Sequence, residues 1–160
     1  MIVALAIAVV VVGFCVVAAL RPAAYRVDRS LDITAPAERV FAIVGDVDQL
    51  AGVFMLFGEP VDKLVKAGKA KLTIEERVAS EKVATKLEIT SPMKSTSTGA
   101  VTLASTPTGS RVMWSMQGDH NFVGKAFRVI VNTDNMLGAD LEKGLAQLKT
   151  VAEAADRHIP

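Results

Sequence analysis

The first 20 residues, MIVALAIAVVVVGFCVVAAL, contain no charged residue and no proline. A helix needs roughly 20 apolar residues to cross the hydrocarbon core of a bilayer. A cleaved signal peptide is the second interpretation, and the small residues of VVAAL offer a place for cleavage. Signal peptides, however, begin with a basic region and have a shorter apolar core. We therefore predict a retained transmembrane anchor over residues 1–20, with residues 2–20 in the membrane, and a short linker over residues 21–24.

The charges beside this segment indicate its orientation. Arg21, Arg26 and Arg29 follow it, whereas only the terminal amine precedes it. Basic residues next to a membrane span favour the cytoplasmic side. We therefore expect a single-pass membrane protein whose folded domain, residues 25–160, faces the cytoplasm.

The stretch YRVDRSLDITAPAERVFAIVG changes from a strand pattern to a helix pattern within a few residues. Its first half carries apolar residues of one parity, Tyr25, Val27, Leu31 and Ile33. This alternation is typical of a strand with one buried face. Pro36 suits the first turn of a helix, where its missing N–H costs nothing. Apolar residues then recur at helical spacing over residues 37–44, which predicts a short helix packed on a core.

Four alternating segments follow further along the chain: KAKLTIEERVAS, VATKLEIT, TGAVTLAS and SRVMWSMQ. They predict an antiparallel meander with one dry and one wet face, and Glu76 interrupts the first of them as a bulge does. The stretch over residues 54–68 shows no clear period and is predicted to be a loop with a short strand.

The C-terminal part, residues 121–160, is predicted to be helical. Leucine and alanine recur there at a spacing of three to four residues, at Leu137, Leu141, Leu145, Leu148 and Ala152. Gly138 and Gly144 weaken such a helix by roughly 1 kcal/mol each relative to alanine. A close approach of the helix to the sheet, or a bend in the helix, would offset that loss.

Two parts of the chain resemble START-like proteins, in particular the polyketide cyclase/dehydrase and lipid-transport family. YRVDRSLDITAPAERVFAIVGDVDQL is similar to the family's first segment. GSRVMWSMQGDHNFVGKAF and DNMLGADLEKGLAQLKTVAE are similar to its last strand and C-terminal helix. Some members also begin with one membrane span followed by Arg-Pro. The resemblance covers residues 25–50 and 84–156, and it implies an α+β helix-grip fold: a curved antiparallel sheet packed on a long C-terminal helix, here preceded by one transmembrane helix.

The chain departs from the family at two places. Family members usually carry tryptophans shortly after the position of Asp46, whereas this chain has Leu50, Val53 and Phe54. The segment over residues 51–68 is also shorter than usual, as if a strand and its loop were lost. These departures leave open whether the sheet is complete and whether the cavity is closed on that side, and a relative that has diverged in this way could have a filled cavity and no small ligand.

The resemblance implies a cavity between the sheet and the C-terminal helix that holds an apolar molecule. The residues expected to line it are Leu87, Ile89, Val101, Leu103, Val112, Trp114 and Met116 from the strands, with Phe127, Ile130, Leu137 and Leu141 from the tail. Ordinary core packing is the simpler explanation for any single one of them, because burying a large apolar side chain contributes roughly 1.5–3 kcal/mol. Trp114 is the strongest candidate, because a buried indole N–H needs a partner that a ligand can supply.

Few residues suggest catalysis or metal binding. Asp119 and His120 are weak candidates for a proton carrier, since adjacency alone orients neither group toward a substrate. With two histidines and one cysteine, no zinc site of a usual ligand set can be assembled. The sequence implies no cofactor. The formal net charge of +1 also argues against nucleic acid as a partner, which would require a concentrated basic face.

These features predict a membrane-anchored START-like domain that binds an apolar small molecule or lipid and that we expect not to be an enzyme. Two alternatives stay open. The first is a polyketide cyclase/dehydrase-like enzyme that uses Asp119 or His120. The second is a non-catalytic interaction module tethered to the membrane, which the short segment over residues 51–68 favours.

Overall fold

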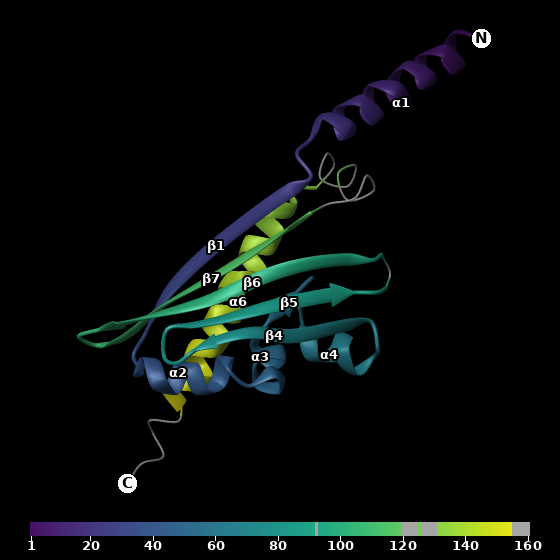
Figure 1. The fold of residues 1–160 in the computed structure, drawn as a ribbon. Coiled ribbons are helices and arrows are strands. Elements are labelled where there is room, and N and C mark those ends of the chain that lie inside the picture. Colours follow the sequence, from purple (N-terminus) through teal and green to yellow (C-terminus); the bar gives the residue numbers. More distant parts are fainter. Residues whose placement is uncertain (92, 120–124, 126–130, 155–160) are drawn as a thin grey trace.

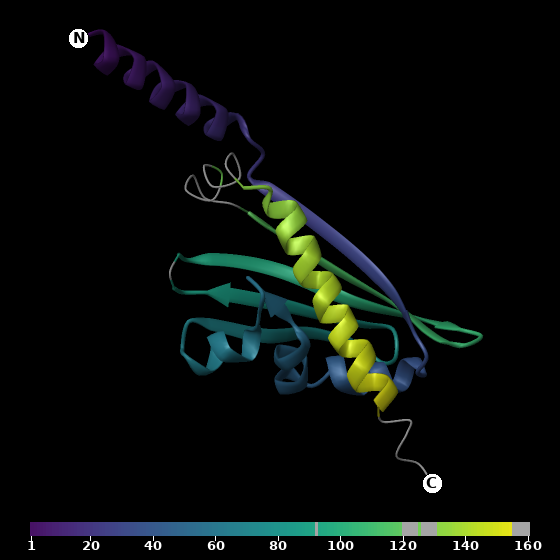
Figure 2. The same cartoon turned by 180° about the vertical axis from the view of Figure 1, so that it is seen from behind.

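The computed structural model describes residues 1–91, 93–119, 125 and 131–154. The described elements are α1 (Ile2–Leu20), β1 (Ala24–Ile33), α2 (Ala37–Val44), α3 (Val47–Val53), β2 (Met55–Leu56), β3 (Glu59–Pro60), α4 (Val61–Lys66), β4 (Ala70–Val78), β5 (Lys82–Ile89), β6 (Ser95–Thr106), β7 (Gly109–Asp119) and α6 (Thr133–Ala154). Five strands form a curved antiparallel sheet, and α6 runs along one face of it (Figures 1 and 2). The predicted α+β architecture is therefore confirmed.

The sheet has the strand order β1-β7-β6-β5-β4. Strands β4 to β7 form the predicted meander. Strand β1 is an edge strand and pairs with β7 along its whole length, with Ala24 opposite Asp119 and Ile33 opposite Ser110. The register of β4 shifts between Ile74 and Glu76, where the sequence predicts a bulge. The alternating pattern of each strand turns its apolar residues toward α6, α2 and α3. We call this side of the sheet its inner face.

Helix α1 projects away from the rest of the protein at the start of β1 (Figures 1 and 2). Its side chains are exposed apart from those of Phe14 and Ala18. By length and composition α1 is able to cross a membrane, and a signal sequence near the N-terminus passes the same test.

Helix α2 forms where the sequence predicts it, and with α3 it covers one end of the inner face. Helix α2 begins after Pro36 and buries Val40 and Val44. Helix α3 begins after Asp46, whose carboxylate accepts hydrogen bonds from the backbone N–H groups of Asp48 and Gln49. Such a cap satisfies donors that have no partner within the helix.

The prediction for residues 54–68 was wrong in part, because it missed α4. The segment forms the small hairpin β2–β3, which is separate from the five-stranded sheet, and then the helix Val61–Lys66. This helix has six residues and fully buries only Val61. A helix this short shows no apolar period, so its pattern does not distinguish it from a loop.

Helix α6 confirms the predicted buried stripe, since Leu137, Leu141, Leu145, Leu148 and Ala152 are all buried. Its glycines mark close approaches. A Cβ on Gly144 would lie 2.9 Å from the carbonyl oxygen of Val53 and 3.3 Å from a ring carbon of Trp114, and a Cβ on Gly138 would overlap the guanidinium of Arg29. The backbone contact accounts for Gly144, whereas the atoms near Gly138 belong to the end of a flexible arginine side chain, which is able to move aside. The rest of the predicted helical tail, residues 121–124, 126–130 and 155–160, lies outside the described residues.

A cross-strand ion pair on the exposed side of the sheet predicts a pH effect. Arg111 donates two hydrogen bonds to the carboxylate of Asp32, at 2.8 and 3.0 Å. These bonds hold the pKa of Asp32 below its usual range. The folded pKa of Asp32 therefore lies below the value of the unfolded chain, which is about 3.9. The ion pair stabilises the fold fully above that unfolded value, and this contribution is lost as the pH falls through the folded pKa. The effect is expected to be small and screened by salt, because both groups are exposed.

Arg111→Gln tests this pair directly. We expect the Asp32 carboxyl group to titrate at a higher pH in the variant than in the wild type, as measured by the carboxyl carbon chemical shift in NMR. An unchanged midpoint would show that the two side chains do not interact in solution.

Candidate functional site

Most of the predicted lining residues meet in one internal cluster between the inner face and α6. The strands contribute Leu87, Val101, Leu103, Val112, Trp114 and Met116, and α6 contributes Leu137 and Leu141, all of them buried. Ile89 is half-buried at the margin of the cluster. Phe127 and Ile130 lie outside the described residues. This arrangement fits both a ligand-lining wall and an ordinary core, so the distinction depends on polar groups inside the cluster.

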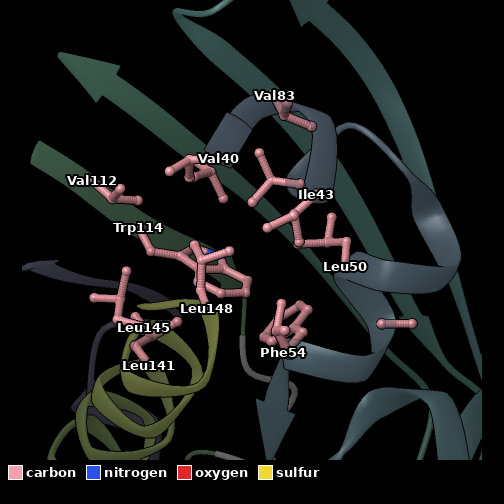
Figure 3. Close-up of a cluster of buried hydrophobic side chains, with 14 of the residues drawn as sticks. Val40, Ile43, Leu50, Phe54, Val83, Val112, Trp114, Leu141, Leu145 and Leu148 are labelled. Atoms are coloured by element: carbon pink, nitrogen blue, oxygen red, sulfur yellow. The ribbon is translucent and has the colours of Figure 1, made fainter. Parts of the chain in front are cut away.

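Trp114 lies at the centre of this cluster (Figure 3). Its ring centroid is 4.9 Å from that of Phe54, with the two planes at 50°, and Leu141, Leu145 and Leu148 face it from α6. The side chain is 1% exposed, and its Nε1 has no hydrogen-bond partner among the described residues. A buried donor without an acceptor costs about 1–3 kcal/mol. The predicted need of Trp114 for a partner is therefore not met by the described part of the protein.

Thr85 and Gly99 border the same indole, and neither was predicted from the sequence to be a site residue. A Cβ on Gly99 would lie 3.1 Å from the Oγ1 atom of Thr85 and 4.0 Å from the Nε1 atom of Trp114. Thr85 is buried, as are its strand neighbours Val83 and Leu87. The sequence offered one indication of its position: Thr85 falls on the same side of the alternating strand pattern as Val83 and Leu87. We call the region bounded by Gly99, Thr85 Oγ1 and Trp114 Nε1 the Gly99 subsite.

A second polar pair lies on the inner face nearer to the start of β1. Tyr25 packs over Gly118, with its hydroxyl oxygen 2.9 Å from the position of a Cβ on that glycine. Its hydroxyl group is hydrogen-bonded to the side chain of Ser97, which is buried. Burial raises the pKa of Tyr25, so the phenol is uncharged at neutral pH. The pair therefore adds polarity to the inner face without adding a charge.

Asp119 lies outside the buried cluster, but its charge adds to the effect of burial in raising the pKa of Tyr25. It is exposed at the end of β7 and borders an open surface hollow of about 630 Å³ together with Glu88, Lys94 and Thr96. Its predicted partner His120 lies outside the described residues. A second open hollow, of about 450 Å³, lies at the start of α2 beside the β6–β7 turn. Ile89, which packs against the buried cluster, also borders the first hollow, and Ala35 and Ala37 of the cluster border the second.

Asp140 of α6 ties the β2–β3 hairpin to the helix. Its carboxylate accepts hydrogen bonds from the backbone N–H of Phe57 at 2.7 Å and of Gly58 at 3.1 Å. Both turn residues have positive φ angles, 53° and 79°. Asp140 was not predictable from the sequence, since a single aspartate within a helix forms no recognisable motif. Its contacts hold the hairpin beside the interior that contains Trp114.

No metal site is evident in the described parts of the chain, where no group of three or more His, Cys, Asp or Glu side chains is placed to hold an ion. Among the described residues, the buried polar side chains on the sheet are Thr85, Ser97 and Ser110 together with the indole of Trp114, and Asp140 is the buried carboxylate on α6.

A curved antiparallel sheet that grips a C-terminal helix over an apolar interior defines the helix-grip class of proteins. The model of the family described as polyketide cyclase/dehydrase and lipid transport matches residues 24–153. The chain belongs to this family. No curated protein matches its sequence.

Solved structures share the fold at low sequence identity. Protein SA2116 from Staphylococcus aureus has a TM-score of 0.60 and 11% identity, over 87% of this chain and 99% of that one. Protein MLL2253 from Mesorhizobium loti has a TM-score of 0.59 and 9% identity, over 85% and 100%. The di-domain ARO/CYC StfQ from the steffimycin biosynthetic pathway has a TM-score of 0.54 and 12% identity, over 83% and 52%. At such identities the likeness concerns the fold alone.

Proposed function

We propose that this protein is a membrane-anchored helix-grip domain that binds an apolar small molecule or lipid between its sheet and α6. The observation that carries the proposal is the indole N–H of Trp114, which is buried among apolar side chains without a described partner. Buried polar groups in folded proteins are almost always hydrogen-bonded. A ligand bound in the interior would contact the surrounding apolar side chains and would provide the missing acceptor.

The family description, which includes lipid transport, supports the same class of ligand. Helix α1 supports the place of action, because its exposed apolar side chains are costly to keep in water and favourable in a bilayer. Arg21 and Arg26 follow this helix directly, which favours a domain on the cytoplasmic side. A domain held at the membrane would meet ligands that dissolve poorly in water.

The ligand proposal is testable by fluorescence, because Trp114 is the chain's single tryptophan. The full chain in detergent micelles is titrated with methyl 9,10-dibromostearate, an uncharged ester whose bromine atoms quench an indole only on contact. We expect saturable quenching by the brominated ester and none by methyl stearate. The matched control is the double variant Trp114→Phe, Met113→Trp. In this variant the indole lies on the opposite side of β7, because the side chain of Met113 in the wild type is 44% exposed there. We expect no saturable quenching of this indole. Absence of quenching in the wild type, together with none by a brominated phospholipid, would refute the proposal.

The anchor has a separate test. Each aspartate at the centre of a span costs about 2.5–3.5 kcal/mol on insertion scales. We expect the full chain to stay in the membrane pellet after an alkaline carbonate wash, and the double variant Val10→Asp, Val11→Asp to be released. The variant Val10→Leu, Val11→Leu is the control and should stay in the pellet. A mature wild-type chain that lacks residues 1–20 by mass would instead identify a cleaved signal peptide.

A further inference from the structure

We propose that the ligand carries an uncharged carbonyl group whose oxygen accepts a hydrogen bond from Trp114 Nε1 in the Gly99 subsite. This inference rests on the proposed function and specifies its ligand. An indole N–H is a donor only, so its partner must be an acceptor. The side chain is 1% exposed, so the acceptor must be inside the protein.

The position of the acceptor follows from the strand pairing. Gly99 on β6 lies opposite Thr85 on β5 and Met116 on β7, and Trp114 lies opposite Val101, two residues further along β6. Because Gly99 has no side chain, the inner face is lowered at this point between the threonine hydroxyl and the indole. The position that a Cβ of Gly99 would take is 3.0 Å from the backbone carbonyl oxygen of Ser115, 3.1 Å from the Oγ1 atom of Thr85 and 4.0 Å from Nε1 of Trp114. Two acceptor oxygens repel each other, so a ligand carbonyl oxygen bound to Nε1 would lie toward the hydroxyl of Thr85, which is able to act as a second donor.

The charge of the ligand follows from the side chains around the subsite. Thr85, Val101 and Met116 are uncharged and buried. Arg29 on β1 also faces α6, but Glu142 already accepts a hydrogen bond from it at 2.8 Å, and its side chain is 35% exposed. None of these described side chains carries a free positive charge that would compensate a carboxylate bound at the Gly99 subsite, and a buried charge without a partner is strongly unfavourable. A ketone, ester or amide carbonyl satisfies the indole at no such cost.

The rest of the ligand is apolar. The indole ring is packed between Phe54 and the leucines of α6 (Figure 3). A molecule whose carbonyl reaches Nε1 must therefore place its remaining atoms against hydrocarbon. The ligand class is a long-chain or ring-containing apolar molecule with a neutral carbonyl near one end of its apolar part.

The test compares two probes that differ in a single group, 2-tridecanone and n-tridecane. The full chain, labelled with ¹⁵N at the indole of its single tryptophan, gives one indole N–H resonance. We expect 2-tridecanone to bind about 10-fold more tightly than tridecane, because only the ketone makes the hydrogen bond. We also expect the ketone alone to move the indole proton downfield.

Variants separate the hydrogen bond from the surrounding packing. Trp114→Phe keeps an aromatic ring without the donor and should bind both probes with the same affinity, as measured by native mass spectrometry. Gly99→Ala puts a methyl group into the subsite and should weaken ketone binding more than alkane binding. Thr98→Ala changes an exposed neighbour on the opposite side of β6 and should alter neither.

Each contrary result has a distinct meaning. Equal binding of both probes by the wild type, without a downfield shift, would overturn the carbonyl inference and leave apolar binding intact. Binding of neither probe would overturn the inference and count against the proposed function. An indole proton that is already downfield in the free protein, and that the ketone does not move, would indicate a buried water as the acceptor and would also overturn the inference. These comparisons need only the wild-type chain, so they hold even if a variant fails to fold.

Discussion

Gly144→Val is expected to destabilise the domain by about 3 kcal/mol, at the upper end of the usual range for overpacking. A Cβ at this position would lie 2.9 Å from the backbone carbonyl of Val53 and 3.3 Å from the ring of Trp114. A backbone oxygen cannot rotate away as the end of a long side chain can, so α6 would have to move off the interior. Denaturant unfolding of the full chain in detergent measures the change.

Gly52→Ala is the matched control for this substitution. Gly52 also lies in a helix, but a Cβ there would meet no atom within 4 Å. The variant should therefore gain about 0.4–1 kcal/mol, since alanine restricts the unfolded chain more than glycine does. If both variants gained stability, α6 would lie farther from α3 and Trp114 than the structure places it.

Asp140→Ala is expected to cost about 3 kcal/mol. The carboxylate accepts two backbone hydrogen bonds in the turn at Phe57 and Gly58, and hydrogen bonds to charged groups contribute about 1.5–3 kcal/mol each. Partial access of water to the turn reduces the sum. Asp140→Asn keeps one acceptor oxygen and should cost about half as much. Thermal unfolding of the three proteins under the same conditions measures these differences.

Glu142→Ala on the same helix is the control for Asp140. Its carboxylate pairs with Arg29 and is 64% exposed, and surface ion pairs typically contribute less than about 1 kcal/mol. Equal losses in Asp140→Ala and Glu142→Ala would show that the hairpin does not depend on Asp140.

The long elements of this fold were predictable because their sequence periods are clear. Buried residues alternate with more exposed ones along β5 and β7, and over the first three residues of β4. The leucine spacing from Leu137 to Leu148 marks the buried side of α6. Helix α4 was not predictable, since a helix of six residues with only one fully buried side chain has no period to detect. Local patterns therefore indicate extended, half-buried elements and miss short, exposed ones.

The candidate site was predictable only in its apolar part. Alternation placed Val101, Val112 and Trp114 on one face, and the structure brings them into one cluster. Asp140 was missed because its partners are backbone N–H groups 83 and 82 residues away, a relation that no local spacing encodes. The sequence places Thr85 on the same side of its strand as buried apolar residues. Only the fold shows that Thr85 lies near the indole of Trp114.

The two departures from the family pattern have structural counterparts. Phe54, one of the residues where relatives usually have tryptophans, packs against Trp114 with its ring centroid 4.9 Å away. The shortened segment over residues 51–68 folds into the end of α3, the β2–β3 hairpin and α4, and the main sheet retains all five predicted strands. The interior is therefore flanked by α3 and the hairpin as well as by α6.

The most direct measurement is a crystal structure of the full chain purified from the cells in which it naturally occurs, with attention to the density beside Trp114. We predict elongated density that belongs to no protein atom, with one end within hydrogen-bonding distance of Nε1. An interior filled completely by the protein's own side chains, with Nε1 bonded to a protein acceptor, would contradict the binding function proposed for this fold.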